Sequence, residues 1–222
     1  MGFTRNMGFT RNMDPGFSSV AAVLDRLGLP PELLSPLLAH AAAVAEDSPR
    51  LGLVSTGDEA HVLSRHTADS LLTALVRTPA PLERWVDVGS GGGFPGIPLA
   101  ICYPGTSFTL VESNGKKAGF IEREVLDLGI ANITVLAERS AEAGGEFDVA
   151  VCRALAAPGA AMETLFSLVR LGGQCLVLAA SAVGGAQVVR VDIPEVDSPG
   201  TVSMMTRTVP SSPREGEGGL ER

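Results

Sequence analysis

The residues of this chain best suited to do chemistry are five glycines crowded into positions 89–96, directly after a short apolar run. Trp85, Val86 and Val88 predict a buried strand, and the glycines predict a tight loop behind it. Glycine reaches positive φ and has no Cβ, so such a loop lets the backbone approach a ligand and point free N–H groups at it. Pro98 suits the first turn of a following helix. A strand, a loop and a helix in this order predict a cradle for a nucleoside-type cofactor.

The sequence of the same loop is also compatible with a dinucleotide-binding enzyme. Residues 91–96 satisfy the G-x-G-x-x-G pattern, and Glu112 follows at roughly the ~20-residue spacing of a ribose-binding acid. Two features favour another cofactor, since Asp87 stands two residues before the first glycine and prolines interrupt the entry into the helix. An NAD-linked oxidoreductase also needs a His or Tyr for hydride transfer, and Tyr103 is the only tyrosine.

The acidic side chain of Glu112 stands at the carboxyl end of a second predicted strand, residues 107–111. Ligand contacts in open α/β sheets lie outside the carboxyl ends of the strands. A carboxylate there can accept hydrogen bonds from both hydroxyls of a ribose. The alternative is a charge that only favours the N-terminus of the next predicted helix, residues 114–128.

A polar pair precedes the glycine loop in the chain. The helix predicted over residues 58–76 carries His66 and Asp69 three positions apart, so they are neighbours on one helix face. Ser70 points elsewhere, so a Ser-His-Asp triad cannot form locally. We interpret the pair as an anchor between this helix and the strands, the alternative being a supporting role at the rim of the cofactor site.

The elements that must position these residues alternate between strand and helix along the chain. This alternation predicts an α/β fold with a parallel, doubly wound, Rossmann-like sheet and right-handed crossovers. Helices within residues 18–46 and 58–76 form an N-terminal extension of this core. Further strands are predicted at 133–136, 147–152 and 176–179, a helix at 160–170, and two additional strands at 188–193 and 201–206.

The length of 222 residues is sufficient for one domain. A six-residue unit occurs twice at the start and shows no buried periodicity, and the end is rich in Ser, Pro, Gly and Glu. The predicted organisation is a disordered leader over 1–17, a single domain over 18–208 with helices in 18–78 and the Rossmann-like core in 84–208, and a loose tail over 209–222.

Composition limits the classes of partner. No apolar run approaches the ~18 residues of a membrane span, so no membrane partner is expected. The net charge of −8 argues against a surface that binds nucleic acid everywhere, although a local basic patch remains possible. Cys102, Cys152 and Cys175 are widely spaced in apolar surroundings, which predicts reduced, buried thiols in a cytoplasmic protein and no metal site.

Several motifs occur in an order that resembles the methyltransferase G family of the bacterial small-subunit ribosomal RNA, also called glucose-inhibited division protein B. The resemblance covers roughly residues 30 to 178. Its most discriminating part is the Gly-Phe-Pro-Gly-Ile-Pro string, which generic methyltransferase loops lack. The motifs are Arg65-His66 with Asp69-Ser70-Leu71, Val86 to Ile101, Leu110 to Ser113 with Lys116-Lys117, and Phe147-Asp148 with Arg153-Ala154-Leu155.

The resemblance implies transfer of a methyl group from S-adenosyl-L-methionine to N7 of a guanine in 16S ribosomal RNA or the small ribosomal subunit, by a protein expected to be a monomer. It implies Arg153, at the end of the fourth strand, as the catalytic residue facing the reacting centre. For Arg123 and Arg139 the alternative is a solvated, partly salt-bridged face. The implied cofactor-binding residues are Gly89, Gly91, Gly93, Phe94, Glu112, Ala141, Glu142 and Arg153, and the RNA-binding candidates are Lys116, Lys117, Arg123 and Arg139.

The implied reaction needs no general base, because guanine N7 already presents a lone pair. Positioning and exclusion of water can supply up to ~7 to 11 kcal/mol of the barrier. Two features depart from the family: the run Leu176 to Ser181 lacks the usual lysine, and the tail from Arg214 is acidic. They motivate a further alternative, a catalytically weak module that binds the cofactor or the ribosome.

Overall fold

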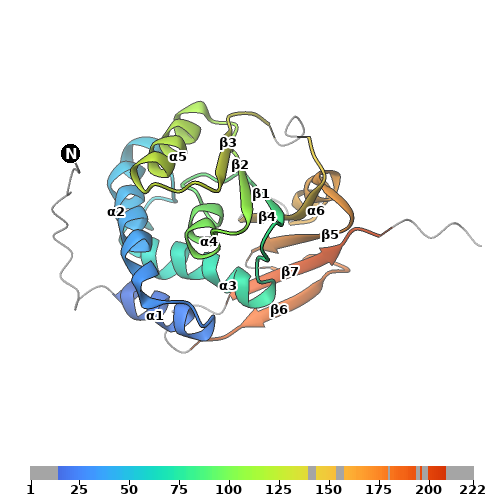
Figure 1. Cartoon of the computed structure of the whole chain (residues 1–222), viewed down its shortest axis with the longest axis horizontal. Helices are drawn as coiled ribbons and strands as arrows, with labels where there is room; N and C mark the ends of the chain where they lie inside the picture. The colour runs from blue at the N-terminus through green and yellow to red at the C-terminus, as the bar shows by residue number, and fades with distance from the viewer. Residues whose placement is uncertain are drawn as a thin grey trace, which may run out of the picture.

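The computed structural model describes residues 15–139, 144–153, 158–179, 181–193, 196 and 200–208, and a seven-stranded sheet forms its centre (Figure 1). The order of the strands is β3-β2-β1-β4-β5-β7-β6, so the direction of winding reverses at β1. Ligands of doubly wound sheets bind at such a reversal. The strands are β1 (Arg84–Val88), β2 (Ser107–Val111), β3 (Ile133–Leu136), β4 (Phe147–Arg153), β5 (Val169–Leu178), β6 (Gln187–Val191) and β7 (Gly200–Thr206).

Helices cover both faces of the sheet, as a doubly wound fold requires. One buried cluster joins the sheet to α1–α5, and a second, smaller cluster joins it to α6. The helices are α1 (Pro15–Arg26), α2 (Leu34–Leu51), α3 (Ala68–Val76), α4 (Gly96–Cys102), α5 (Gly115–Asp127) and α6 (Pro158–Leu168), with short turns η1 (Pro31–Leu33), η2 (Glu59–His61) and η3 (Val62–Thr67).

The alternation of side chains along a strand decides which residues meet the N-terminal helices. In β1, Trp85 belongs to the cluster that contains α1–α5, whereas Val86 and Val88 belong to the α6 cluster. In β4, Val149 and Val151 lie on the first face. Side chains two positions apart in a strand lie on the same face. Asp87 follows Trp85 by two residues and Arg153 follows Val151 by two, so both point toward the N-terminal helices.

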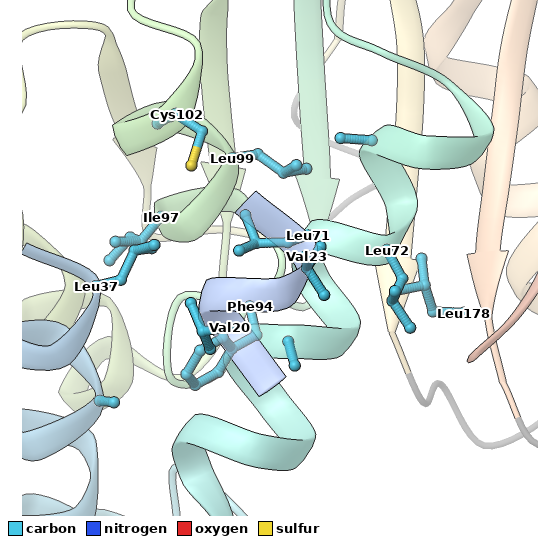
Figure 2. Packing of buried hydrophobic residues seen from close by; sticks show 14 of the residues in the cluster. Val20, Val23, Leu37, Leu71, Leu72, Phe94, Ile97, Leu99, Cys102 and Leu178 are labelled. Carbon is cyan, nitrogen blue, oxygen red and sulfur yellow. The ribbon is translucent and has the colours of Figure 1, made fainter. Parts of the chain in front are cut away.

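The N-terminal helices pack directly against the segment that follows the glycine loop. Figure 2 shows Val20 and Leu71 grouped with Phe94, Ile97 and Leu99, and all five are buried in one cluster. The helix predicted over residues 58–76 is present as three consecutive helical segments: the 3-10 turn η2, the π-helical turn η3 and the α-helix α3. π-Helical turns are rare and occur frequently at functional sites.

The predicted parallel pairing is confirmed for β1 to β5, and the two additional strands, for which no direction was predicted, pair differently. β7 lies between β5 and β6 and runs antiparallel to both. The reason is the length of the connection: only residues 192–199 join β6 to β7, and a parallel crossover needs a dozen or more residues. β5 is also longer than predicted, because its pairing with β4 extends back to Val169.

The ends of the predicted domain are described only in part. α1 begins at Pro15, so its first turn overlaps the leader predicted over residues 1–17. Residues 1–14 and 209–222 lie outside the described residues. Cys102, Cys152 and Cys175 are free and buried, as predicted.

Among the described residues, no helix combines the length and the apolar character needed to cross a membrane. In the same part of the chain, no group of three or more His, Cys, Asp or Glu side chains could hold a metal ion.

Candidate active site

The glycine loop joins β1 to α4 at the carboxyl edge of the sheet. Gly89, Gly91 and Gly93 have φ values of 72°, 56° and 90°, which other residues rarely adopt. The N–H of Gly89 donates to the carbonyl of Val111, the last residue of β2, at 2.8 Å. The loop is therefore fixed to the end of the neighbouring strand, with Gly89 exposed at its surface.

Glu112 follows β2 and fixes the loop from the other side. Its Oε2 accepts the N–H of Gly91 at 2.9 Å, and its Oε1 accepts the N–H of Asn114 at 2.8 Å. The side chain is buried. Each carboxylate oxygen has two lone pairs, so both oxygens keep the capacity to accept a further hydrogen bond, for example from a ribose hydroxyl.

Asp87 supports the loop from below. Its Oδ2 accepts the N–H of Gly96, the first residue of α4, at 2.9 Å. Burial raises the pKa of this carboxyl to about 7, and the charge of Glu112 acts in the same direction. Oδ1 of Asp87 is buried and has no hydrogen-bond partner within the described residues. A Cβ on Gly96 would lie 2.8 Å from Asp87 Oδ2, which explains why only glycine fits here.

Phe94 lies behind the loop rather than on its surface. Its ring is buried among the side chains of the N-terminal helices, as Figure 2 shows. The ring centroid is 5.0 Å from that of His40 and 5.4 Å from that of His66. A cofactor contact by Phe94 would therefore come from its backbone, and the ring acts by holding the loop against α2 and η3.

Arg153 ends β4 and reaches across to η3 and α3. Its guanidinium contacts Nδ1 of His66, and its Nη2 lies 3.3 Å from Oδ2 of Asp69. Because arginine only donates, Nδ1 of His66 must be the unprotonated nitrogen. Nε2 then carries the proton and faces Asp58 at 3.5 Å. The predicted anchor between this helix and the strands is thus confirmed, and Arg153 is its partner.

Burial controls the protonation of this cluster. It lowers the pKa of His66 to about 4, and the positive charge of Arg153 adds to the effect. Burial also raises the pKa of Asp69 to about 6, although Arg153 opposes that shift. The pKa of Arg153 is lowered by burial as well. Near neutral pH the cluster therefore holds a neutral imidazole between charged groups. The hydroxyl of Ser70 donates to the carbonyl of His66 at 2.6 Å, so it is no nucleophile.

The predicted RNA-binding residues are spread over a wider surface. Lys116 and Lys117 lie in the first turn of α5, where the side chain of Asn114 caps the helix by accepting their N–H groups. Arg123 pairs with Asp47 of α2, and Arg139 is exposed after β3. Ala141 and Glu142, which the resemblance implies as cofactor-binding residues, fall outside the described residues.

Two residues near the site were not predicted from the sequence, a buried histidine that supports Phe94 and an arginine at the end of α2. His40 is completely buried, and its Nδ1 lies 3.5 Å from Oε2 of the buried Glu124. A polar residue within the apolar stripe of α2 could have indicated it. Arg50 lies at the last turn of α2 beside Arg123, a proximity that only the packing of α2 on α5 reveals.

The family model described as rRNA small subunit methyltransferase G (GidB) matches residues 34–188 of the chain. This match covers more than half of the sequence and includes every described part of the site. The chain belongs to this family.

Curated relatives of this G-family methyltransferase agree with the assignment. The ribosomal RNA small subunit methyltransferase G of Stenotrophomonas maltophilia is 40% identical over 166 residues, which are 72% of this chain and 73% of that protein. The protein of the same name from Roseiflexus castenholzii is 39% identical over 150 residues, 65% of this chain. The match spans 63% of the Roseiflexus protein, which is less than two thirds of its length.

Solved structures support the fold of this G-family chain. A mutant of MtNAS in complex with S-adenosylmethionine has a TM-score of 0.54 at 21% identity, and the match covers 87% of this chain and 78% of that one. MtNAS in complex with MTA and tNA has a TM-score of 0.51 at 18% identity, covering 87% and 76%. These structures confirm the predicted Rossmann-like fold. The family match confirms the predicted family, methyltransferase class and S-adenosyl-L-methionine cofactor. The comparisons give no support to an NAD-linked oxidoreductase or to a module that only binds.

Proposed function

We propose that the chain transfers a methyl group from S-adenosyl-L-methionine to N7 of a guanine in 16S ribosomal RNA, free or within the small ribosomal subunit. The observation that carries the proposal is the joint geometry of Glu112 and the glycine loop at the carboxyl edge of the sheet. The names of the curated relatives point to the same RNA.

The residues present fit the cofactor. The loop is a cradle in which a side chain at Gly89 or Gly91 would be strained, since both have positive φ. Glu112 offers free lone pairs for the ribose. Most N–H groups of the loop already donate within the protein, so the exposed backbone at Gly89 is proposed to contact the methionine end. Ala141 and Glu142 are proposed beside the adenine. When bound, S-adenosyl-L-methionine supplies an electrophilic methyl group.

The chain's own residues have to orient the guanine. N7 attacks with a lone pair that is already available, so no residue must remove a proton. Arg153 is a fixed donor at the end of β4, and we assign it to O6 of the base, which leaves the N7 lone pair free. Asp69 and His66 hold the guanidinium in place from the helix side. Lys116, Lys117, Arg123 and Arg139 are proposed to contact RNA phosphates.

We expect a cytoplasmic monomer without a metal cofactor, with a single methyltransferase domain over residues 18–208. Light scattering coupled to size exclusion checks the monomer, and unchanged turnover after treatment with a chelator checks the independence of a metal.

The experiment that tests the cofactor half of the function combines binding and transfer. Calorimetry should show binding of S-adenosylhomocysteine and none of NAD. Labelled methyl groups should pass to small-subunit particles in the presence of the wild-type chain. Gly89→Asp should abolish both, because it adds a side chain at a φ of 72° and a negative charge at the loop surface. Binding of NAD without a response to S-adenosylhomocysteine would contradict the proposal.

A further inference from the structure

A groove lies between the last turn of α2 and one face of α5, with a cavity volume of about 320 Å³. Lys116, Gly119 and Arg123 share one face of α5, because residues three and four positions apart are neighbours on a helix. Gly119 contributes no side chain, which leaves the middle of this face open. The groove is lined by Arg50, Leu51, Lys116, Gly119, Phe120 and Arg123.

The groove, called the basic groove below, is positively charged although the net charge of the whole chain is −8. Arg50, Lys116 and Arg123 line it, and the nearby carboxylate of Asp47 pairs with both arginines. Hydrogen bonding to Arg50, assisted by Arg123, lowers the pKa of Asp47, so this carboxylate stays ionised and neutralises one of the three positive charges. A net positive charge remains in the groove.

The arginine of α5 is held ready for a ligand. Its guanidinium lies over the ring of Phe120, 5.1 Å from the centroid. Asp47 engages one terminal nitrogen of Arg123, and 42% of the arginine side chain remains exposed. A guanidinium presents five donors in a planar fork, which matches the geometry of phosphate.

The basic groove starts at the edge of the cofactor site. Lys116 N–H donates to the side chain of Asn114, whose own N–H donates to Glu112. On the other wall, Leu53 follows the end of α2 and lies against the loop, since a Cβ on Gly91 would be 3.6 Å from its carbonyl oxygen. A strand of RNA that leaves the reacting base can therefore run from the loop into the groove.

We propose that the basic groove formed by Arg50, Lys116 and Arg123 binds a backbone phosphate of the substrate RNA next to the target guanine. The inference rests on the proposed function and extends it, because Arg50 and the opposing Asp47 have no assigned part in RNA binding. Phosphate contacts fix the register of a protein on a nucleic acid without reading its sequence. The groove is thus a positioning site for the strand, separate from the groups that hold the base.

The experiment compares Arg50→Gln and Arg123→Gln with a matched control, Arg26→Gln, in the exposed last turn of α1. Turnover on small-subunit particles and filter binding of 16S RNA are measured across a series of salt concentrations. Each groove variant should raise KM for the particles by about 3- to 10-fold and flatten the slope of log affinity against log salt by about 0.7 to 1. kcat, the affinity for S-adenosylhomocysteine and the control should stay at wild-type values.

Asp47→Asn provides a test of opposite sign. It removes the negative charge beside the groove but keeps a similar shape, so RNA binding should tighten and its salt slope should steepen. Wild-type KM and salt slope in both arginine variants would overturn the proposal. The proposed function and the role of the groove are tested by different measurements. If the wild-type chain transfers no methyl group, the proposed function fails. Filter binding still shows in that case whether RNA affinity depends on Arg50 and Arg123.

Discussion

Oε2 of Glu112 lies 2.9 Å from the backbone nitrogen of Gly91, although the two residues are 21 positions apart in the chain. The contact joins the end of β2 to the middle of the glycine loop. The acid proposed to hold the ribose therefore also sets the position of the loop proposed to hold the methionine end. A change at Glu112 must therefore affect both the contact to the ribose and the position of the glycine loop.

Glu112→Gln should weaken the binding of S-adenosylhomocysteine by at least about 10-fold, because hydrogen bonds to a charged group contribute roughly 1.5–3 kcal/mol each. The amide nitrogen would also face the N–H of Gly91 or Asn114, both of which need an acceptor. Calorimetry measures the loss. Glu122→Gln, on the exposed face of α5, is the matched control and should bind normally. Equal affinity in the two variants would refute the role of Glu112.

Gly96→Ala should lower the free energy of unfolding by about 1–3 kcal/mol, as overpacking of a close-packed core does. The new Cβ would lie 2.8 Å from both Oδ2 of Asp87 and the side chain of Leu110. Chemical denaturation measures the change. Gly119→Ala is the control, because its Cβ would meet no atom within 4 Å and alanine stabilises a helix interior by up to about 1 kcal/mol. Destabilisation by both variants alike would contradict the packing at Gly96.

His66→Gln should change how stability depends on pH. In the wild type the pKa of His66 is lowered to about 4 from 6.5, so the unfolded chain binds more protons between these values. The contribution of neutral His66 to the free energy of unfolding is therefore fully present above pH 6.5 and is lost as the pH falls toward 4. The difference in unfolding free energy between wild type and variant should shrink in this window and stay constant above it. A difference independent of pH between 4 and 7 would show that His66 is not buried in its neutral form.

Asp69→Asn should separate positioning from stability. The pKa of Asp69 is raised to about 6 because burial outweighs the attraction of Arg153, so the folded state disfavours the ionised carboxyl. An amide should then fold at least as stably at pH 7. Without its counter-charge the guanidinium of Arg153 loses its fixed position, and kcat/KM for methyl transfer should fall at least about 10-fold. If Asp69→Asn unfolds at a lower denaturant concentration than the wild type but keeps normal turnover, Asp69 stabilises the fold and does not position Arg153.

Sequence patterns predicted the parts of the molecule that depend on local interactions. The β-branched run before Gly89, the glycine loop and the acid at Glu112 are adjacent in the chain or follow the rule that ligands meet strand ends, so their placement could be predicted. The antiparallel insertion of β7 was not predicted, because the pattern of a strand does not reveal its neighbours. The length of the connection from β6 is the signal that could have found it.

The contacts of Arg153 and Arg50 depend on tertiary packing. His66 and Asp69 were predicted to be neighbours from helical spacing, but their contact with Arg153, 87 and 84 positions away, needs the alternation of β4 and the approach of η3 together. Arg50 and Arg123 meet at Asp47 only because α2 packs on α5. Such long-range pairs leave no periodic pattern in a single sequence.

Arg153 is proposed to orient a guanine of 16S RNA for attack by N7. The most direct measurement is chemical mapping of the RNA after incubation with S-adenosyl-L-methionine, since N7-methylguanosine makes the strand cleavable by borohydride and aniline. The wild-type chain should produce one strong cleavage at a guanine, and Arg153→Ala should reduce it about 100-fold or more while S-adenosylhomocysteine still binds. Methylation at another atom or on another base, or equal cleavage with Arg153→Ala, would contradict the claim.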